Sequence, residues 1–308
     1  MRKLFFNKAF LVLLALIILI VIVIVGSRNE AFFKKDNFQI KELKGSERPF
    51  TWDKIAPLEN DFPTDEGGII LYENKYYNPI QIANEGLFFI DTYRQTNNPE
   101  FLWRAEKYAH KLLELSVKAS GALYFPYEFD FALHNIQSET LKAPWYSGMA
   151  QGEALSLLTR LYQITEKSEY LESADQVFKS FTNFRGNGPW TVDIDENGYY
   201  WIEEYPNPNA ASDHVLNGFI YGLYGVYDYY SLTGNIQSRA ILNASLLTLK
   251  HYLPDFRNPG QISFYCLGHK QMSESYHRKH IKQLEMLYKI TNDIFFKTMA
   301  DKFYEDYH

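Results

Sequence analysis

The sequence is nearly free of cysteine, carries no excess of positive charge and lacks the short motifs of nucleotide-dependent enzymes. Cys266 is the single thiol in 308 residues, which excludes an intrachain disulfide framework and a multi-cysteine metal site. The net charge of -6 argues against general nucleic-acid binding, which needs a basic face. Walker, dinucleotide-glycine, HExxH and G-x-S-x-G motifs are absent. We therefore expect no cofactor and no bound metal.

Aromatic residues, by contrast, are abundant. The chain has 24 tyrosines and 23 phenylalanines, and 46% of its residues are hydrophobic. This is enough for one sizeable core, or at most two domains. Aromatic rings stack on sugar faces, which suits a carbohydrate-binding protein, but they also fill helical cores. The composition alone leaves both interpretations open.

The N-terminus contains the only long apolar run, from Ala9 to Val25, preceded by Arg2, Lys3 and Lys8. Its length and flanking charges predict a transmembrane signal anchor over residues 1–27, with a cytoplasmic N-terminus. A cleaved signal peptide is the alternative. Either segment places the rest of the chain outside the cytoplasm, at a cell surface, in a periplasm or in a Golgi-type lumen. Residues 28–68 are polar and contain three prolines, so we expect a stem ahead of a domain over residues 69–308.

A Tyr-x-x-Thr repeat organises that domain. The four pairs are Tyr93/Thr96, Tyr162/Thr165, Tyr230/Thr233 and Tyr288/Thr291. Each pair joins two helical patterns, with Thr, Asn and Ser at the turns as expected N-caps. Four helical hairpins at a period of roughly 60–70 residues predict an all-α fold, an incomplete α/α toroid.

In such a toroid the site lies where the connections between hairpins meet, here residues 121–145, 184–214 and 253–280. The second connection reads as a β-hairpin with Gly198 at its turn. Its return strand places Glu203 and Glu204 among tyrosines and a tryptophan. Two carboxylates in an aromatic cluster indicate a site that moves protons.

The third connection is rich in basic residues. They are His269, Lys270, His277, Arg278, Lys279, His280 and Lys282, opposed by Glu274. A zinc site among these histidines lacks a fourth group, so the segment is better interpreted as gripping an anionic substrate. A solvated start to the last helix is the alternative.

The small residues after Ser147, a predicted N-cap, allow close helix packing, whereas Gln81, Gln151 and Asn217 are expected to face the mouth of the toroid.

Six segments of the sequence form an ordered set, and this set identifies a family more specifically than any one segment does alone. They are YYNPIQIANEGL, PWYSGMAQGEALSLLTRLYQIT, WIEEYP, VLNGFIYGLYGVYD, FYCL and YHRKHIKQLEMLYKIT. In this order, over most of residues 70–292, they resemble the C-terminal domain of the D-glucuronyl C5-epimerases, which modify heparosan and heparan sulfate. The resemblance implies the same incomplete α/α toroid. It also implies conversion of glucuronate to iduronate within a glycan, by removal of the C5 proton and reprotonation from the opposite face.

The resemblance places Glu204 and Tyr276 as the opposing acid/base pair, supported by Tyr205 and Tyr265. Nearby cations would have to lower the pKa of Tyr276 for it to act as a base. The residues expected to contact the substrate are Asn217, Tyr221, Tyr77, Gln81, Tyr146, Gln151, His269, His277, Arg278 and Lys279.

Two departures from animal members bear on the substrate. Gly268 stands where they carry an arginine, and the MSES segment before Tyr276 replaces an arginine-tryptophan pair. The resemblance therefore supports C5 epimerisation more strongly than a heparan-type substrate. The alternatives are a toroid polysaccharide lyase or glycoside hydrolase, or a non-catalytic glycan-binding module. A single interior acid site, Glu203/Glu204, argues against hydrolysis. Whether the chain forms a homodimer stays open.

Overall fold

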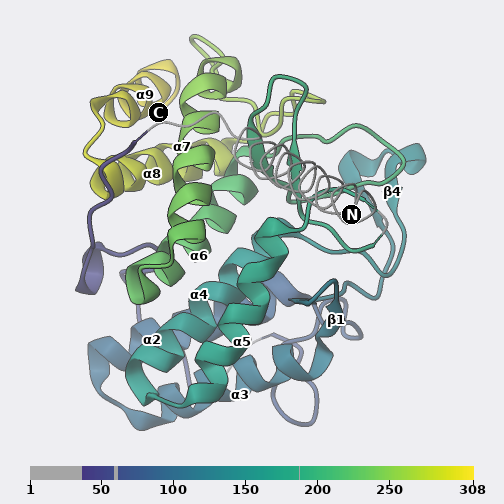
Figure 1. Cartoon of the computed structure of the whole chain (residues 1–308), viewed down its shortest axis with the longest axis vertical. Coiled ribbons are helices and arrows are strands. Elements are labelled where there is room, and N and C mark those ends of the chain that lie inside the picture. The colour runs from purple at the N-terminus through teal and green to yellow at the C-terminus, as the bar shows by residue number, and fades with distance from the viewer. Residues whose placement is uncertain (1–36, 59–61, 187) are drawn as a thin grey trace, which may run out of the picture.

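The computed structural model of the chain describes residues 37–58, 62–186 and 188–308 (Figure 1). The predicted membrane anchor over residues 1–27 lies outside these ranges. Within them, every helix is too short or too polar to cross a bilayer.

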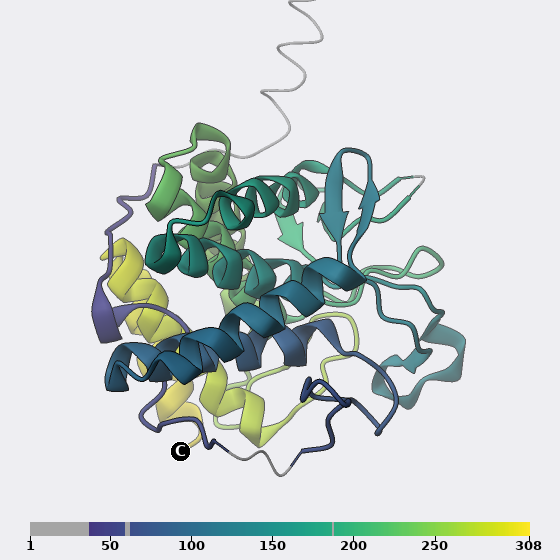
Figure 2. The same cartoon turned by 90° about the horizontal axis from the view of Figure 1, so that it is seen from below.

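Helical hairpins dominate the described chain. The pairs are α2 (Pro79–Thr96) with α3 (Pro99–Leu115), α4 (Gly148–Thr165) with α5 (Ser168–Phe178), α6 (Leu216–Thr233) with α7 (Ile236–Phe256), and α8 (Glu274–Thr291) with α9 (Ile294–Asp306). The first helices pack in the order α2, α4, α6, α8, and each also packs on its own partner (Figures 1 and 2). This is packing of the α/α-toroid type, as predicted, with α2, α4, α6 and α8 as inner helices.

The Tyr-x-x-Thr repeat marks the end of each inner helix. In the first unit the Asn97 N–H donates to the Tyr93 carbonyl at 2.8 Å. The Thr96 hydroxyl donates to the Thr92 carbonyl and accepts from the Asn98 N–H. The same three bonds recur in the other units. The residue after each threonine is left-handed, with φ between 54° and 64°, as helix C-caps require.

Threonine is therefore a helix terminator, and the prediction that it serves as an N-cap is wrong. The caps of the outer helices are instead side chains such as Asn98 and Asn235. The prediction for Ser147 is confirmed, since its side chain accepts from the Ala150 N–H. The threonine hydroxyl donates to a carbonyl of the last helical turn. It also accepts from the backbone N–H two residues later, which fixes the position of that residue.

The closest helix pair, α4 and α6, crosses at glycines. A methyl group at Gly225 would lie 2.0 Å from the Gly152 carbonyl oxygen, and one at Gly152 would lie 2.4 Å from the Gly222 Cα. Any side chain here would force the helices apart, so the backbones touch directly. This packing explains the small residues near the start of α4.

The connections that precede α4 and α6 contain short strands and 3₁₀ turns, and a further 3₁₀ turn precedes α2. The strands form three antiparallel pairs: β1 (Val117–Ala119) with β2 (Ala122–Tyr124), β3 (Phe131–Ala132) with β4 (Thr140–Leu141), and β5 (Val192–Ile194) with β6 (Tyr200–Ile202). The 3₁₀ turns are η1 (Gly45–Glu47), η2 (Leu133–Asn135), η3 (Gln137–Glu139) and η4 (Lys179–Thr182). The predicted β5–β6 hairpin is confirmed, with Gly198 at a φ of 81°. Because β6 ends at Ile202, Glu203 and Glu204 lie beyond the strand rather than within it.

Residues 37–58 contain one short 3₁₀ turn and are packed against the helices (Figure 1). Phe38 and Phe50 are buried in the same core as the helical hairpins. The Arg160 guanidinium, on α4, donates to the Pro49 and Phe50 carbonyls and, at 2.8 Å, to Asp228 on α6. Asp228 also binds Arg48 at 2.8 Å. This buried charge network attaches the segment to two inner helices.

Candidate active site

Glu204 is a buried carboxyl in the connection between β6 and α6. Its side chain is held against Gly218, where a methyl group would lie 2.1 Å from Glu204 Oε2. Only glycine leaves room for the carboxyl there. Burial raises the pKa of Glu204 to about 7, against the opposing influence of hydrogen bonds from Tyr205 and Tyr265. The group is therefore divided between its acid and base forms near neutral pH.

Three phenols surround this carboxyl. The Tyr265 hydroxyl donates to Glu204 Oε2 at 3.4 Å and lies 3.5 Å from the Tyr205 hydroxyl. The Tyr276 ring, in the first turn of α8, packs on the Tyr265 ring with centroids 4.5 Å apart. The second and third connections thus bring together the four residues that the sequence predicted as catalytic.

The ionisation of Tyr276 differs from the prediction. Burial raises its pKa, and the negative charge of Glu204 raises it further. The expectation that His277, Arg278 and Lys279 lower this pKa is therefore wrong. Lys279 does lie near, with its ammonium 4.5 Å from the Tyr276 ring centroid, but it is exposed to solvent. Tyr276 is therefore a protonated phenol at neutral pH, so its hydroxyl is able to donate a proton.

A second interior carboxyl, Glu153 on α4, was not predicted from the sequence. It is fully buried, and within the described chain neither carboxylate oxygen has a hydrogen-bond partner in good geometry, although Asn84 is close enough to favour its charged form. Burial raises its pKa well above the ordinary value, and Glu204 raises it further. An acid in the interior turns of a helix with small and apolar neighbours was the available signal.

Other polar atoms share this interior. Gln81 Oε1, Asn217 Oδ1 and Gln283 Oε1 are also buried without a hydrogen-bond partner in the described chain. They come from α2, α6 and α8, so together with Glu153 on α4 each inner helix contributes a buried polar group, and the Gln283 amide donates to the Asn217 carbonyl at 3.0 Å. Buried polar groups without protein partners are unusual, and their convergence favours a ligand-binding interior. Tyr221 on α6 is close enough for the charges of Glu153 and Glu204 to raise its pKa, after burial itself. Contact of Asn217, Gln81 and Tyr221 with a substrate stays a prediction.

Several predicted substrate-binding residues have other partners. The Gln151 amide is fully buried and bonds to the Leu123 carbonyl and the Ser180 hydroxyl. The Tyr77 hydroxyl donates to Asp65, and the Tyr146 ring packs edge-on against Tyr124. These contacts join the side chains to the scaffold around the site.

The predicted basic residues of the third connection also have other partners, with one exception. His277 is buried, with Nδ1 bonded to Ser263 and Nε2 facing the Tyr307 carbonyl. Arg278 is exposed and pairs with Glu274 at 2.7 Å. His269 faces Asp213 and Glu139. Of the predicted basic contacts, Lys279 alone lies next to Tyr276 in the described structure.

Glu203 has a structural partner. Its Oε1 lies 2.7 Å from His214 Nδ1, and its carbonyl accepts from the Gly148 N–H at 2.7 Å. Burial acts to lower the pKa of His214, but the charge and hydrogen bond of Glu203, together with nearby aspartates, outweigh it and the pKa is raised. Of the two adjacent carboxylates, Glu203 thus anchors the loop, whereas Glu204 lies among the phenols.

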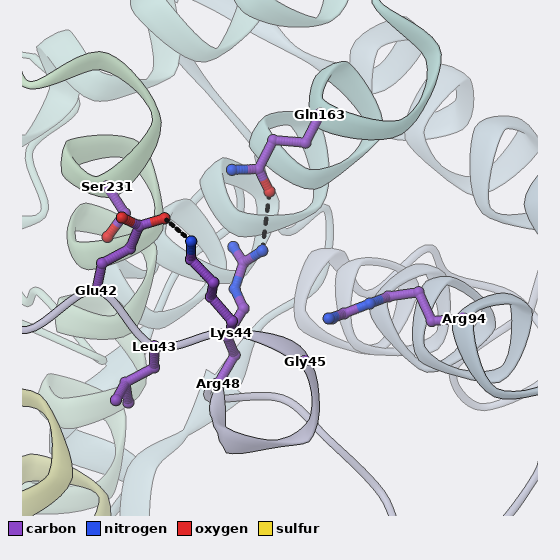
Figure 3. Close-up of a pocket in the computed structure, with 8 residues that line it drawn as sticks. All are labelled: Glu42, Leu43, Lys44, Gly45, Arg48, Arg94, Gln163 and Ser231. Carbon is purple, nitrogen blue, oxygen red and sulfur yellow. Dashed lines mark hydrogen bonds and ion pairs between the residues drawn. The ribbon is translucent and has the colours of Figure 1, made fainter.

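A separate hollow of about 250 Å³ lies at the opposite end of the inner helices (Figure 3). It is lined by Glu42, Leu43, Lys44, Gly45, Arg48, Arg94, Gln163 and Ser231. Ser231 lies near the end of α6, whereas Asn217 lies at its start. Arg48 is engaged by Gln163 and Asp228. The residues that line this hollow include no acid/base pair comparable to Glu204 and its phenols. The candidate active site is therefore the end of the inner helices that holds Glu204.

The chain is similar in sequence to several known proteins. A family model described as D-glucuronyl C5-epimerase C-terminus matches residues 120–305. The chain is 30% identical over 183 residues to an uncharacterized protein of Methanocaldococcus jannaschii, a match covering 58% of this chain and 56% of that protein. It is 30% identical over 177 residues to the D-glucuronyl C5-epimerase of Caenorhabditis elegans, covering 51% of this chain and 28% of that enzyme. The matches thus span about half of the first relative and less than a third of the second.

Among solved structures, the cellobiose 2-epimerase from Bacillus thermoamylovorans B4167 is similar in fold. The TM-score is 0.55 at 17% identity, and the match covers 84% of this chain and 68% of that one. At this identity the likeness concerns the fold alone.

Proposed function

The chain belongs to the D-glucuronyl C5-epimerase family, and from this premise we propose that it is a uronyl C5-epimerase acting on glucuronate residues within a polysaccharide. The observation that carries the proposal is the buried Glu204 carboxyl, with a pKa of about 7, among the phenols of Tyr205, Tyr265 and Tyr276. Epimerisation at C5 needs one group that takes a proton and another that returns one.

The protonation states suggest the order of events. The ionised Glu204 carboxylate removes the C5 proton, and the electron pair of the broken C–H bond spreads into the uronate carboxylate. The Tyr276 phenol then gives its proton to C5 from the opposite face, which inverts the centre. The resulting phenolate lies beside the Lys279 ammonium, which stabilises its charge.

The site must then be reset, because Glu204 now holds a proton and Tyr276 has lost one. The Tyr265 hydroxyl donates to Glu204, and its ring packs on Tyr276. We assign Tyr265 to relaying the proton between them, with Tyr205 positioning the Glu204 carboxyl. This route returns both groups to their starting forms without a cofactor or a net change in protons.

Incubation of the purified protein with heparosan-type polymer in deuterated water tests the proposal. Deuterium at C5 without chain cleavage is expected. New unsaturated ends would mean a lyase, which shares the first proton abstraction but expels the C4 substituent. Binding without exchange would mean a glycan-binding module.

One observation favours a second candidate, a glycoside hydrolase. Glu153 is a second buried carboxyl that senses the charge of Glu204, and hydrolases use paired carboxylates. The sequence-based argument that only one interior acid site exists is therefore wrong. Hydrolysis would release new reducing ends and leave no deuterium at C5, so the same incubation separates the two functions.

We further propose that the Ala9–Val25 run anchors the protein in a membrane, with the helical body outside the cytoplasm. The support is the length of the apolar run and the basic residues ahead of it. Retention in the membrane pellet after alkaline extraction, together with protease sensitivity from the outer side, is the expected result. Release into the alkaline supernatant would refute the anchor.

A further inference from the structure

A second polar cluster lies next to the candidate active site. His134, Asp213, Cys266 and His269 each offer one ligand atom, and these atoms all lie within 4.8 Å of one another. His134 Nε2 is 2.8 Å from Asp213 Oδ2 and 3.4 Å from Cys266 Sγ. His269 Nδ1 is 2.9 Å from Asp213 Oδ1. Asp213 and Cys266 are buried, and the two histidines are partly buried.

We propose that these four residues form a structural site for a divalent metal ion of the zinc type. Two imidazoles, one thiolate and one carboxylate are a donor set that suits zinc, whereas calcium and magnesium prefer oxygen alone. With metal–ligand bonds of about 2.0–2.3 Å, tetrahedral geometry separates the ligand atoms by about 3.3–3.7 Å. The contacts to Asp213, at 2.8 and 2.9 Å, need to open by roughly half an ångström to reach this spacing. Ligand atoms at the 4.8 Å limit of the cluster need to close by about one ångström.

The surroundings of His269 support this assignment. Its Nδ1 faces Asp213, while its other ring nitrogen lies 3.1 Å from Glu139 Oε2. A histidine that binds a metal through one nitrogen usually donates its other N–H to a carboxylate, which fixes the ring and its tautomer. Glu139 is itself held through its carbonyl, which accepts from the Asn207 amide.

The backbone also prearranges the cluster. The N–H groups of Leu267 and Gly268 donate to the Asp213 carbonyl at 3.1 Å, and that of His269 reaches Asp213 Oδ1 at 3.2 Å. A methyl group at Gly268 would lie 2.5 Å from Asp213 Oδ1, so glycine is needed for this approach. His134, in the remaining connection, has a φ of 53°, a conformation that is unfavourable for histidine and is held here by the contacts of its ring.

The site explains how the three connections are fixed to one another. His134 comes from the connection before α4, Asp213 from the one before α6, and the other two ligands from the one before α8. Four protein ligands close the coordination sphere, which is typical of a structural rather than a catalytic site. Cys266 directly follows Tyr265, and the His134 ring lies 5.9 Å from the Tyr265 ring. The metal would therefore hold Tyr265 in place, but its binding does not depend on the proposed epimerase activity.

Metal analysis and cobalt substitution test the proposal directly. The purified full chain is stripped with a chelator, loaded with Zn²⁺ or Co²⁺, and desalted. We expect about one equivalent of metal per chain. The cobalt protein should show a near-ultraviolet thiolate charge-transfer band and intense visible bands of four-coordinate Co²⁺. Substoichiometric binding of both metals, or a weak octahedral spectrum, would overturn the site and leave a hydrogen-bonded polar cluster.

Variants identify the ligands. Cys266→Ser should abolish the charge-transfer band, and Glu139→Gln should keep the spectrum while weakening affinity by about 10- to 100-fold. The matched control is His308→Ala, which removes an exposed imidazole far from the cluster in the chain and should change neither. A charge-transfer band that persists in Cys266→Ser would contradict the assignment. Because the wild-type spectrum is decisive by itself, a misfolded variant would not hide the answer.

Discussion

Replacing Glu204 with glutamine should stabilise the protein and inactivate it, with a pH dependence that identifies the cause. Burial raises the pKa of Glu204 from an ordinary 4.5 to about 7. The folded state therefore holds a proton that the unfolded state releases between these pH values. While Glu204 is protonated, the folded state buries no charge there, so this contribution to the unfolding free energy is fully present below pH 4.5. It is lost as the pH rises through about 7 and the buried carboxyl ionises.

The size of the effect follows from the two pKa values. A difference between 4.5 and about 7 corresponds to about 3 kcal/mol of unfolding free energy at pH 8. Glutamine keeps the shape of the side chain but never ionises. The free energy of unfolding of Glu204→Gln, relative to wild type, should thus rise by about 3 kcal/mol between pH 4 and pH 8.

Urea unfolding followed by circular dichroism at several pH values measures this difference. Glu196→Gln, in the exposed turn of the β5–β6 hairpin, is the control and should show no such rise. Deuterium exchange at C5 should fall by about 10²- to 10⁴-fold in Glu204→Gln. A stability difference that is constant across pH, or that favours wild type at pH 8, would refute the assignment of a buried, proton-holding carboxyl.

Other changes test the remaining parts of the structure. Tyr276→Phe should abolish exchange without loss of helix content by circular dichroism, whereas near-normal exchange would exclude this phenol as the proton donor. Asp228→Ala leaves Arg160 buried without its partner and should cost about 3–5 kcal/mol in urea unfolding; an effect below 1 kcal/mol would show that the pair is not buried in solution. Because Arg160 and Arg48 outweigh burial and lower the pKa of Asp228, its stabilising contribution is present above an unfolded pKa near 3.9 and should fade only in stronger acid. Gly225→Ala would place a methyl group 2.0 Å from the Gly152 carbonyl oxygen and should lower thermal stability by about 1–3 kcal/mol, whereas Gly234→Asn should be tolerated because Asn97 and Asn292 hold the equivalent left-handed position.

The sequence predicted the fold well because its signals were local. The Tyr-x-x-Thr repeat depends on bonds within six residues, so its period revealed four hairpins without knowledge of their packing. Glu204 and its phenols were likewise found through short ordered segments. The burial of Glu153 was not predicted because a helical glutamate is ordinarily solvated. Only the packing of α2, α4 and α6 shows that this side chain is buried.

Contacts over long sequence distances could not be predicted in the same way. His134, Asp213, Cys266 and His269 meet only because three connections fold against one another, and their spacing matches no metal-binding motif. The adjacent residues His277 and Arg278 looked equivalent in the sequence. On α8, however, a step of one residue turns a side chain by about 100°, which buries one against Ser263 and leaves the other in solvent.

The common ending of the inner helices has an electrostatic consequence. Because each hairpin reverses through the same turn, α2, α4, α6 and α8 all begin at the end that holds Glu204. A helix N-terminus carries a partial positive charge of about half an elementary charge. A chain with a net charge of -6 can therefore still direct partial positive charge from its backbone toward the polyanionic glycan that we propose as its substrate, in addition to the charge of its lysines and arginines.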